Sequence, residues 1–377
     1  MDYSNHGVEV HRSMKTVDHG HPHPNSTPAH ASWAPEQTLH VAVAYSNPFR
    51  WRTRIRLFND FRRHITALPN VRLYVGELAY GDRPFEVTST SNPFDVQLRT
   101  DHELWHKENI LNAVISRFDP EWRYGAYVDG DFTFTRYDVA LETIHMLQHH
   151  DWVQMFSTYC DLTHDHKPLR ILKSFGSRFV SGELTPEVLS RVQKGIPETE
   201  GLYYGAATGS QLIKSRGGIG TTGAAWAWKR PAFNACGGLL DTCILGSGDW
   251  HMAFGLAGEP DIHPNVREMN SVGQRYTDSI KIWQNRAARF VNKNVGCVDC
   301  HAIHHFHGSK VLRKYEHRWK ILRDCDFDPY TDIFKDSQGI YQLTSGKPKL
   351  RDALRDYFKS RNEDDISLRE GDSTMGN

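Results

Sequence analysis

Residues 39–45 read Leu-His-Val-Ala-Val-Ala-Tyr, an apolar run followed by the turn-forming sequence Ser-Asn-Pro at 46–48. This pattern predicts a buried β-strand. Apolar side chains recur at helical spacing over residues 54–68, and residues 71–75 read as a second strand. A strand, a helix and a strand in this order open a parallel, doubly wound sheet, whose ligands bind beyond the carboxyl ends of the strands. The sequence therefore predicts an α/β fold with a site at that edge.

The same pattern continues with a second helix. Residues 100–103, Thr-Asp-His-Glu, form a capping box, and the apolar side chains of residues 104–118 follow on one face. Residues 124–128 then read as a short strand that ends at Asp129 and Asp131. This strand is expected to deliver both carboxylates to the ligand-binding edge of the sheet.

The sequence Asp129-Gly130-Asp131 places two carboxylates on the same side of an extended backbone. Oxygen ligands of this kind suit Mg²⁺ or Mn²⁺, and a bound ion would neutralise phosphate oxygens. An Asp-Gly-Asp tripeptide is also ordinary turn chemistry. The position of the pair at a strand end favours the metal site over the turn.

Further along the chain, residues 151–156 are predicted as another strand, and the polar region up to about residue 220 as a loop that covers the substrate. Apolar residues between 276 and 290 recur at spacings of four and three, which predicts a buried helix face. Residues 350–358 read as one short amphipathic helix.

The bulk composition excludes few partners. The 45 Lys and Arg residues balance the 45 Asp and Glu residues among 377, so no net charge indicates a nucleic acid or a membrane surface. No apolar run reaches the roughly 18 residues that cross a bilayer, and the first thirty residues lack the apolar core of a signal peptide. We therefore expect a cytoplasmic protein with no membrane span.

The six cysteines are sparse and irregularly spaced, which predicts reduced thiols rather than a disulfide framework. Residues 297–301, Cys-Val-Asp-Cys-His, match a haem-attachment sequence and would also offer zinc two thiolates and an imidazole. Because neither an export signal nor a second Cys-x-x-Cys accompanies them, we interpret these cysteines as structural.

A glycine-rich block follows the acidic pair. It runs from Gly-Thr-Thr-Gly-Ala-Ala-Trp at 220–226 through Gly-Gly at 237–238 to Gly-Ser-Gly-Asp-Trp-His at 246–251. Glycine lets the backbone approach a ligand closely, and an aspartate near a helix N-terminus is stabilised as an anion. Asp249 would then accept a hydrogen bond or a proton from a ligand hydroxyl, unless it only caps the helix.

With the Asp-x-Asp before it, this block resembles the GT-A glycosyltransferases, and in particular the β-1,4-galactosyltransferases and the polypeptide N-acetylgalactosaminyltransferases. The resemblance implies a Rossmann-like, mainly parallel sheet flanked by helices in a single large domain. It implies that Asp131 binds the metal directly and that Asp129 holds the nucleotide's ribose or the ion. Where those families carry Glu-Asp, this chain has Gly248-Asp249, so the first carboxylate is missing.

A third motif lies at residues 303–310, Ile-His-His-Phe-His-Gly-Ser-Lys. It is similar to the His-Phe-x-Gly-x-x-Lys motif of glycogenin-like transferases. The resemblance implies His305 as the third metal ligand, with His307 on the same strand face as its rival. It also implies that Lys310, which stands one position early, contacts the diphosphate, with Arg313 and Lys314 as alternatives.

The remaining residues expected at the site lie at the ligand-binding edge of the sheet and in the glycine-rich block. Tyr45, Asn47 and Arg50 end the first strand and are expected to contact the nucleotide, while Gly223 and Trp226 would lie against the donor sugar.

The domain limits follow from the motifs. Residues 1–36 are rich in His and Pro and are expected to be a disordered tail, and residues 361–377 a charged, frayed one. The GT-A glycosyltransferase domain would span 37–360, with a nucleotide-binding half at 37–135 and a donor-sugar and acceptor half at 136–325.

The implied function is metal-dependent transfer of a sugar from a nucleotide sugar, with a UDP-sugar as the expected donor and Mn²⁺ or Mg²⁺ as cofactor. The acceptor hydroxyl would belong to a saccharide, a protein or a modified DNA base. Inversion is slightly favoured over retention, because Asp249 has no acidic neighbour in its motif. The alternatives are a metal-dependent nucleotidyltransferase and a non-catalytic protein that binds nucleotide sugars.

Overall fold

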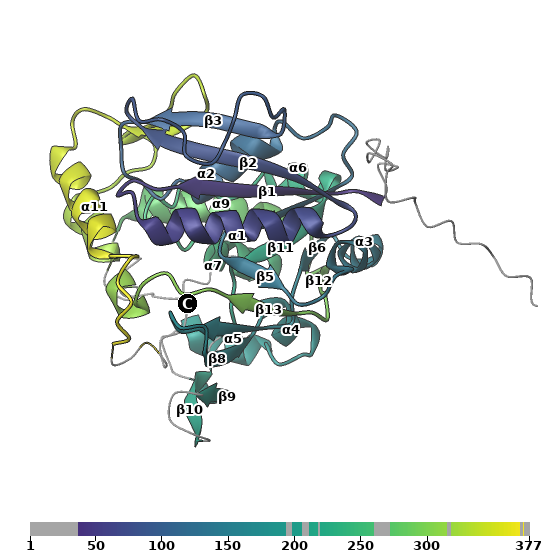
Figure 1. Ribbon diagram of the computed structural model, residues 1–377. Helices are drawn as coiled ribbons and strands as arrows, with labels where there is room; N and C mark the ends of the chain where they lie inside the picture. The colour runs from purple at the N-terminus through teal and green to yellow at the C-terminus, as the bar shows by residue number, and fades with distance from the viewer. Residues whose placement is uncertain are drawn as a thin grey trace, which may run out of the picture. The chain divides into compact units, whose positions relative to one another are not determined.

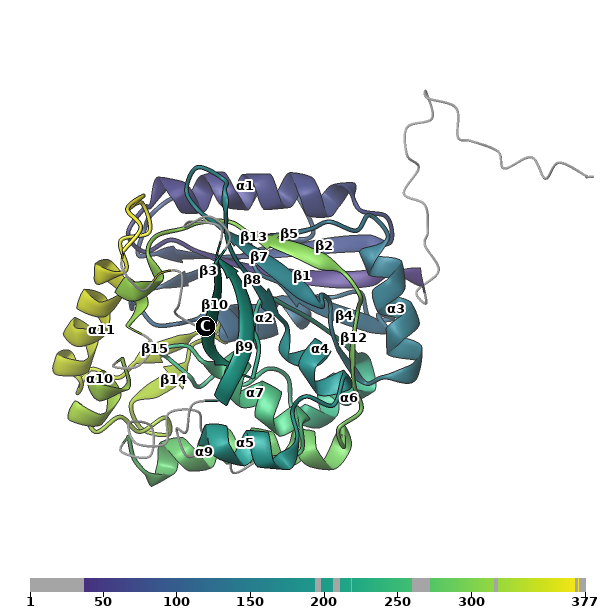
Figure 2. The same cartoon turned by 90° about the horizontal axis from the view of Figure 1, so that it is seen from below.

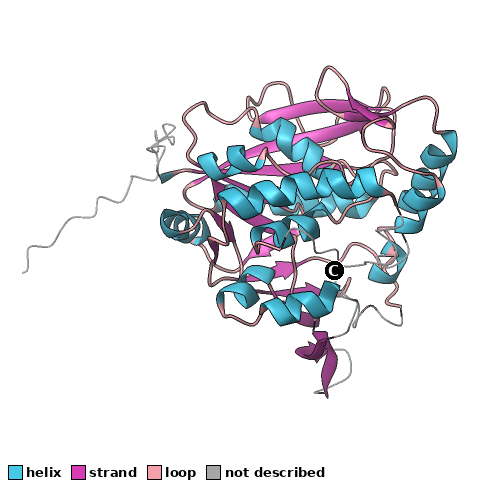
Figure 3. Ribbon diagram, turned by 180° about the vertical axis from the view of Figure 1, so that it is seen from behind, coloured by secondary structure: helices cyan, strands magenta, loops and turns pink. Residues whose placement is uncertain are grey.

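The computed structural model describes residues 37–193, 198–205, 211–217, 219–259, 272–314, 318–369 and 372. The predicted tail at residues 1–36 lies outside the described residues. Strands and helices are interspersed along the described chain, with helices on both sides of the strands (Figure 3).

The centre of the fold is a seven-stranded sheet with the order β12-β6-β11-β4-β1-β2-β3 (Figure 1). All neighbouring strands in it run parallel, except that β11 is antiparallel to both β4 and β6. The predicted α/β fold with a mainly parallel central sheet is therefore confirmed. Its strands are β1 (Leu39–Ser46), β2 (Val71–Tyr80), β3 (Asp95–Thr100), β4 (Tyr124–Val128), β6 (Trp152–Gln154), β11 (Ala225–Lys229) and β12 (Val295–Cys297).

Helices cover the two faces of this sheet. Figure 2 shows α1 along one face, with α7 and α9 on the opposite side. The predicted helix over residues 276–290 is confirmed as α9. The described helices are α1 (Arg52–Ala67), α2 (Lys107–Ile115), α3 (Val139–His149), α4 (Phe175–Val180), α5 (Pro186–Gln193), α6 (Arg230–Cys236), α7 (Gly248–Leu256), α9 (Gln274–Phe290), the 3₁₀ helix η3 (Lys310–Arg313), α10 (Trp319–Asp324) and α11 (Pro348–Ser360).

The alternation of side chains along β1 divides the core in two. Val41 and Val43 pack with Phe58 and other apolar residues of α1, whereas Ala42 belongs to the core on the side of α2. A strand buried on both faces in this way reads as a continuous apolar run, which is the pattern of a parallel sheet. Helix α2 lies so close that a Cβ on Gly76 of β2 would be 2.5 Å from methyl carbons of α2.

Smaller sheets complete the described structure. The strands β5 (Phe132–Phe134), β13 (His301–His304), β7 (Thr158–Leu162) and β8 (Pro168–Lys173) form a second sheet in the order β5-β13-β7-β8. Two hairpins pair β9 (Glu198–Gly205) with β10 (Gln211–Gly217) and β14 (Ile333–Lys335) with β15 (Tyr341–Leu343). In its described parts, the region predicted as a covering loop up to residue 220 is therefore built from strands and helices.

One predicted helix start is also wrong. Thr100 ends β3, its hydroxyl accepts a hydrogen bond from the backbone N–H of His102 at 3.1 Å, and α2 begins only at Lys107. Glu103 does not complete a capping box, because it pairs with Arg355 at 2.8 Å. Residues 101–106, which the sequence pattern assigned to the start of the helix, form a loop that leads into the cavity described below.

Candidate active site

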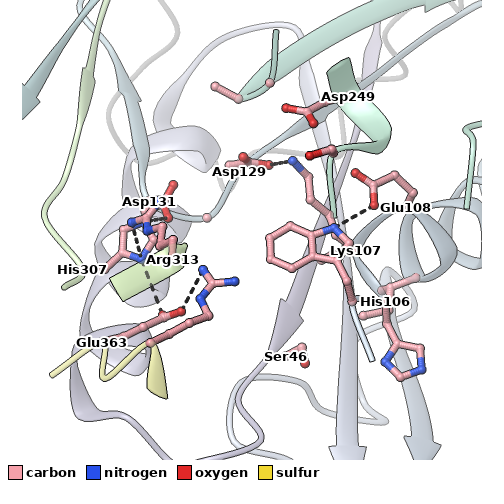
Figure 4. A pocket seen from close by; sticks show the side chains of 18 of the residues that line it. Ser46, His106, Lys107, Glu108, Asp129, Asp131, Asp249, His307, Arg313 and Glu363 are labelled. Atoms are coloured by element: carbon pink, nitrogen blue, oxygen red, sulfur yellow. Dashed lines mark hydrogen bonds and ion pairs between the residues drawn. The ribbon is translucent and has the colours of Figure 1, made fainter. Parts of the chain in front are cut away.

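A cavity of about 270 Å³ lies at the carboxyl ends of β1 and β4, the edge at which ligands were expected (Figure 4). Elements from the whole described chain contribute to its wall. The residues used below that line it are Ser46, Arg54, Lys107, Glu108, Asp129, Asp131, Gly223, Asp249, His304, His307, Arg313, Arg361 and Glu363.

Three side chains at one side of the cavity form a group that fits a metal ion. Potential ligand atoms of Asp131, His304 and His307 all lie within 4.8 Å of one another. Nε2 of His307 is 3.0 Å from Oδ2 of Asp131, and Nε2 of His304 is 3.8 Å from Oδ1 of the same carboxylate. Among the described residues this is the one such group of three or more.

The backbone explains why these three meet. Asp131 sits in the turn between β4 and β5, where the N–H of Phe132 donates to the carbonyl of Asp129 at 3.2 Å. Strand β13 ends at His304, and the N–H of His305 donates to the carbonyl of Asp131 at 3.0 Å. The chain leaves the strand at this point, which brings the rings of His304 and His307 to 5.3 Å between centroids.

Each imidazole is held from behind by a carboxylate. Nδ1 of His304 lies 2.7 Å from Oδ1 of Asp161, and Nδ1 of His307 lies 3.5 Å from Oε2 of Glu363. Both Nε2 atoms are thereby left facing Asp131. A carboxylate behind the distal nitrogen is the arrangement that orients metal-binding histidines in proteins.

The charge states of the group suit metal binding. Burial alone would raise the pKa of Asp131, but His307, His304 and Arg54 outweigh it and hold that pKa well below its usual value. Burial lowers the pKa of His304, so its imidazole is neutral near pH 7. Oδ1 of Asp131 is buried and has no hydrogen-bond partner, so it could serve as a ligand to an ion.

His305, the predicted third ligand, does not join this group. Its Nε2 lies 3.0 Å from the hydroxyl of Thr133 instead. The prediction assumed that the strand continued past His305, but β13 ends one residue earlier. The rival His307 is in the group, and His304 was missed.

Lys310 also lies elsewhere. Its ammonium nitrogen is buried 2.6 Å from Oδ2 of Asp161, behind His304, and it does not line the main cavity. Burial lowers the pKa of Lys310 to about 7, against the opposing charge of Asp161. The predicted contact with a diphosphate in the main cavity therefore does not fit its position.

Three arginines line the main cavity beside the metal group. Arg54 and Arg361 contact the carboxylate of Glu363 at 2.6 and 3.1 Å, and Nη2 of Arg313 lies 2.9 Å from Nε2 of His307. Burial alone would raise the pKa of Glu363, but Arg54 and Arg361 outweigh it and hold the pKa well below its usual value. The guanidinium groups thus exceed the carboxylates at this end of the cavity.

The segment from Arg361 onward is not a frayed tail where it is described. Arg361 and Glu363 are 5% and 2% exposed, and the carboxylate of Asp364 accepts hydrogen bonds from the backbone N–H groups of Arg52 and Thr53 at 3.0 and 2.8 Å. Asp364 therefore caps α1, whose own N-cap residue makes no side-chain cap. The high charge of this segment suggested solvent exposure, yet Arg361, Glu363 and Asp364 each have a partner.

The other carboxylate of the acidic pair is separate from the metal group. Oδ1 of Asp129 lies 2.6 Å from the ammonium nitrogen of Lys107, which also sits 4.8 Å from the ring of Tyr127. Burial raises the pKa of Asp129, although Lys107 opposes the shift. Asp129 and Lys107 line the cavity between the metal group and α7 (Figure 4).

The glycine-rich block reaches the cavity through Gly223 and Asp249. Asp249 lies in the first turn of α7, and Ser247 rather than Asp249 is the N-cap residue. A Cβ on Gly223 would be 2.5 Å from Oδ2 of Asp249, and the hydroxyl of Thr222 donates to that oxygen at 3.4 Å. Trp226 is buried in the core and donates to the carbonyl of Thr222 at 2.6 Å, so it is not available to a sugar.

The residues predicted to bind the nucleotide at the end of the first strand do not line the main cavity. Tyr45 donates to Glu86 at 2.7 Å, and Asn47 accepts from the backbone N–H of Trp51 at 2.9 Å. Together with Arg50 they line a separate cavity of about 210 Å³. Successive residues of a strand point to opposite faces, so it is Ser46 that lines the main cavity.

Glu108 is a cavity residue that the motifs did not indicate. It is 3% exposed, and the indole N–H of Trp105 donates to its Oε2 at 2.9 Å. Burial raises the pKa of Glu108 to about 7, although Lys107 opposes the shift. In the sequence it stands inside an amphipathic helix, where nothing distinguishes it from a solvent-facing glutamate.

The Cys-x-x-Cys-His sequence forms no metal group in the described structure. Burial raises the pKa of both Cys297 and Cys300 to about 11, so both thiols are protonated. The six cysteines are all free, as predicted.

Within the part of the chain that the structure describes, no helix is long and apolar enough to cross a membrane. No protein-family model and no curated protein matches the sequence. The geometry of the cavity is therefore the basis for assigning a function.

Proposed function

We propose that the protein is a metal-dependent glycosyltransferase of the GT-A type, which transfers a sugar from a nucleotide sugar to an acceptor hydroxyl. A UDP-sugar is the expected donor. The observation that carries the proposal is the Asp131, His304 and His307 group, placed beside clustered arginines at the carboxyl edge of a mainly parallel sheet.

The ligand set favours Mn²⁺ over Mg²⁺, because two of the three donors are imidazole nitrogens, whereas Mg²⁺ prefers oxygen. A divalent ion held there supplies positive charge to the leaving diphosphate. Asp161 and Glu363 would keep both histidines turned towards the ion.

The diphosphate would be held by arginine rather than by Lys310. Arg54, Arg313 and Arg361 line the cavity beside the metal group. Arginine presents a planar fork of N–H donors that matches phosphate oxygens and stays charged at any working pH. This assignment places the nucleotide's charged end next to Asp131.

The donor sugar would then lie between the metal group and α7. Gly223 lets the backbone and the sugar approach each other, and the carboxylate of Asp249 is within reach of a sugar hydroxyl there. Asp129 and Lys107 form a charged pair along the same wall, where each can hydrogen-bond to a ribose or sugar hydroxyl.

A metal-dependent nucleotidyltransferase is the second candidate, since it also uses paired aspartates. Enzymes of that class position two ions with several carboxylates. In the described cavity Asp129 is paired with Lys107, which leaves Asp131 as the one carboxylate of the metal group. The geometry therefore favours glycosyl transfer.

The test is release of nucleoside diphosphate from a panel of nucleotide sugars with Mn²⁺, first with water as acceptor and then with saccharides, protein and hydroxylated DNA. We expect Asp131→Ala to lower turnover at least 100-fold and to abolish Mn²⁺ binding measured by calorimetry. Asp352→Asn, an exposed carboxylate on α11, is the matched control and should behave like the wild type.

Three results would contradict the proposal. Unchanged turnover and Mn²⁺ binding in Asp131→Ala would exclude the metal group. Release of sugar 1-phosphate in place of nucleoside diphosphate would assign the site to the nucleotidyltransferase class. Tight donor binding with no turnover would assign it to a binding protein.

A further inference from the structure

Glu108, on the wall of the cavity, has no part in the roles assigned above. It is the second residue of α2, in the first turn, where the helix dipole favours an anion. Its side chain is almost fully buried, and the indole of Trp105 fixes one carboxylate oxygen at 2.9 Å. Figure 4 shows it on the opposite side of the cavity from Asp131, His307 and Glu363.

The start of α7 is shaped around this carboxyl group. A Cβ on Gly248 would lie 3.3 Å from Cδ of Glu108 and 3.0 Å from the carbonyl oxygen of Leu240. A side chain at position 248 would therefore compete with Glu108 for the same space. Glycine at position 248 leaves that space to the carboxyl group that α2 brings there.

The titratable groups that face Glu108 include Lys107, Asp249 and Asp129, and also Tyr127 and Cys243. Lys107 is already committed to Asp129 at 2.6 Å, so it does not form an ion pair with Glu108. A carboxyl group that exchanges its proton near neutral pH is well suited to general acid or base catalysis.

We propose that Glu108 is the general base that accepts the proton of the acceptor hydroxyl, and that Asp249 holds the donor sugar. This inference rests on the proposed glycosyl transfer. The acceptor oxygen bonds to the anomeric carbon, and the bond from that carbon to the phosphate oxygen breaks with its electron pair on the diphosphate. The acceptor proton passes to the carboxylate of Glu108. Because base and leaving group lie on opposite sides of the cavity, the product has the inverted configuration.

Glu108→Gln tests the proposal, because glutamine keeps the size of the side chain and an oxygen that accepts from Trp105. We expect turnover of the donor, with water or an identified acceptor, to fall at least 100-fold, in line with the loss of a general base. Binding of Mn²⁺ and of the nucleoside diphosphate should stay within twofold of the wild type. The rise of the wild-type rate with pH around pH 7 should disappear in the variant.

The matched control is Glu103→Gln, which changes a buried glutamate that pairs with Arg355 and does not line the cavity. It should keep the wild-type rate and pH profile. Proton NMR of the first-formed sugar anomer should show inversion relative to the donor.

The outcomes separate this inference from the proposed function. Wild-type turnover in Glu108→Gln, an unchanged pH profile, or retention of configuration would overturn the role of Glu108 and leave glycosyl transfer standing. Loss of Mn²⁺ or nucleoside diphosphate binding in Glu108→Gln would show that the residue supports the fold of the site and would also overturn it. A wild type that releases no nucleoside diphosphate from any donor would overturn the proposed function itself.

Discussion

The rings of His304 and His307 are oriented by carboxylates that face their Nδ1 atoms. A histidine whose Nδ1 faces a carboxylate carries its proton there, so the lone pair of Nε2 points the other way. Asp161 and Glu363 serve the two rings in this manner, and both Nε2 atoms face Asp131, with Nη2 of Arg313 also 2.9 Å from Nε2 of His307. His305, between them in sequence, has its ring engaged by Thr133 and contributes only a backbone bond to the turn that carries Asp131.

Single alanine substitutions should therefore distinguish the metal ligands among three neighbouring histidines. We expect His304→Ala and His307→Ala each to weaken Mn²⁺ binding at least 100-fold, because each removes one of three protein ligands. His305→Ala should change the affinity less than tenfold. Calorimetric titration with Mn²⁺ measures this, and equal losses in all three variants would contradict the assignment of the ligands.

At the scale of the element, β1 places a titratable ring in the core. His40 is 2% exposed and packs between the rings of Tyr74 and Phe118, at 5.9 and 5.5 Å between centroids. Burial, reinforced by Arg72, lowers the pKa of His40 to about 4, against an ordinary value of 6.5. The folded state therefore favours the neutral ring, while the unfolded chain takes up a proton as the pH falls below 6.5.

It follows that protonation of His40 does not affect the stability of the fold above about pH 6.5 and destabilises the fold progressively as the pH falls towards 4. At pH 5 the loss of unfolding free energy is on the order of 2 kcal/mol. We expect His40→Phe to reduce the difference in urea unfolding free energy between pH 7 and pH 5 by that amount. An unchanged difference would mean that the ring does not set this pH dependence. His106, whose pKa burial also lowers to about 4, remains in both proteins.

On the scale of the whole molecule, the C-terminal segment closes the site. It runs from α11 past the metal group to the start of α1. Glu363 contacts Arg54 and His307, and Asp364 contacts the backbone of Arg52 and Thr53. Ser309, two residues past His307, donates to Asp372 at 2.8 Å. Metal binding and docking of this segment should therefore depend on each other.

Removal of residues 361–377 should lower Mn²⁺ affinity at least tenfold, because His307 loses the carboxylate that orients it. Glu363→Gln should reproduce most of that loss. Asp364→Ala is the control, since it should lower the unfolding free energy by about 1 kcal/mol through the lost cap on α1 but leave Mn²⁺ affinity within twofold. Wild-type Mn²⁺ affinity in the truncated protein would show that the segment does not support the site.

The fold was readable in the sequence because its signals are local. Each signal lies within a short stretch of sequence: the apolar run of β1, the periodicity of α1 and the strand before Asp129. Together they predicted the parallel sheet and the edge at which the cavity lies. Some residues of that edge were also predictable, since Asp131, Asp249 and Gly223 all line the cavity.

The partners of these residues were decided by the tertiary structure. Whether His304 or His305 faces Asp131 depends on where β13 stops, and a shift of one residue along a strand reverses the face, as Tyr45 and Ser46 also show. Glu108, Arg361 and Glu363 carry no local signal, because a charge in a helix or near a chain end reads as solvent-exposed. Only the packing of distant segments buries and pairs these charges, and that pairing is a long-range property that no short stretch of sequence contains.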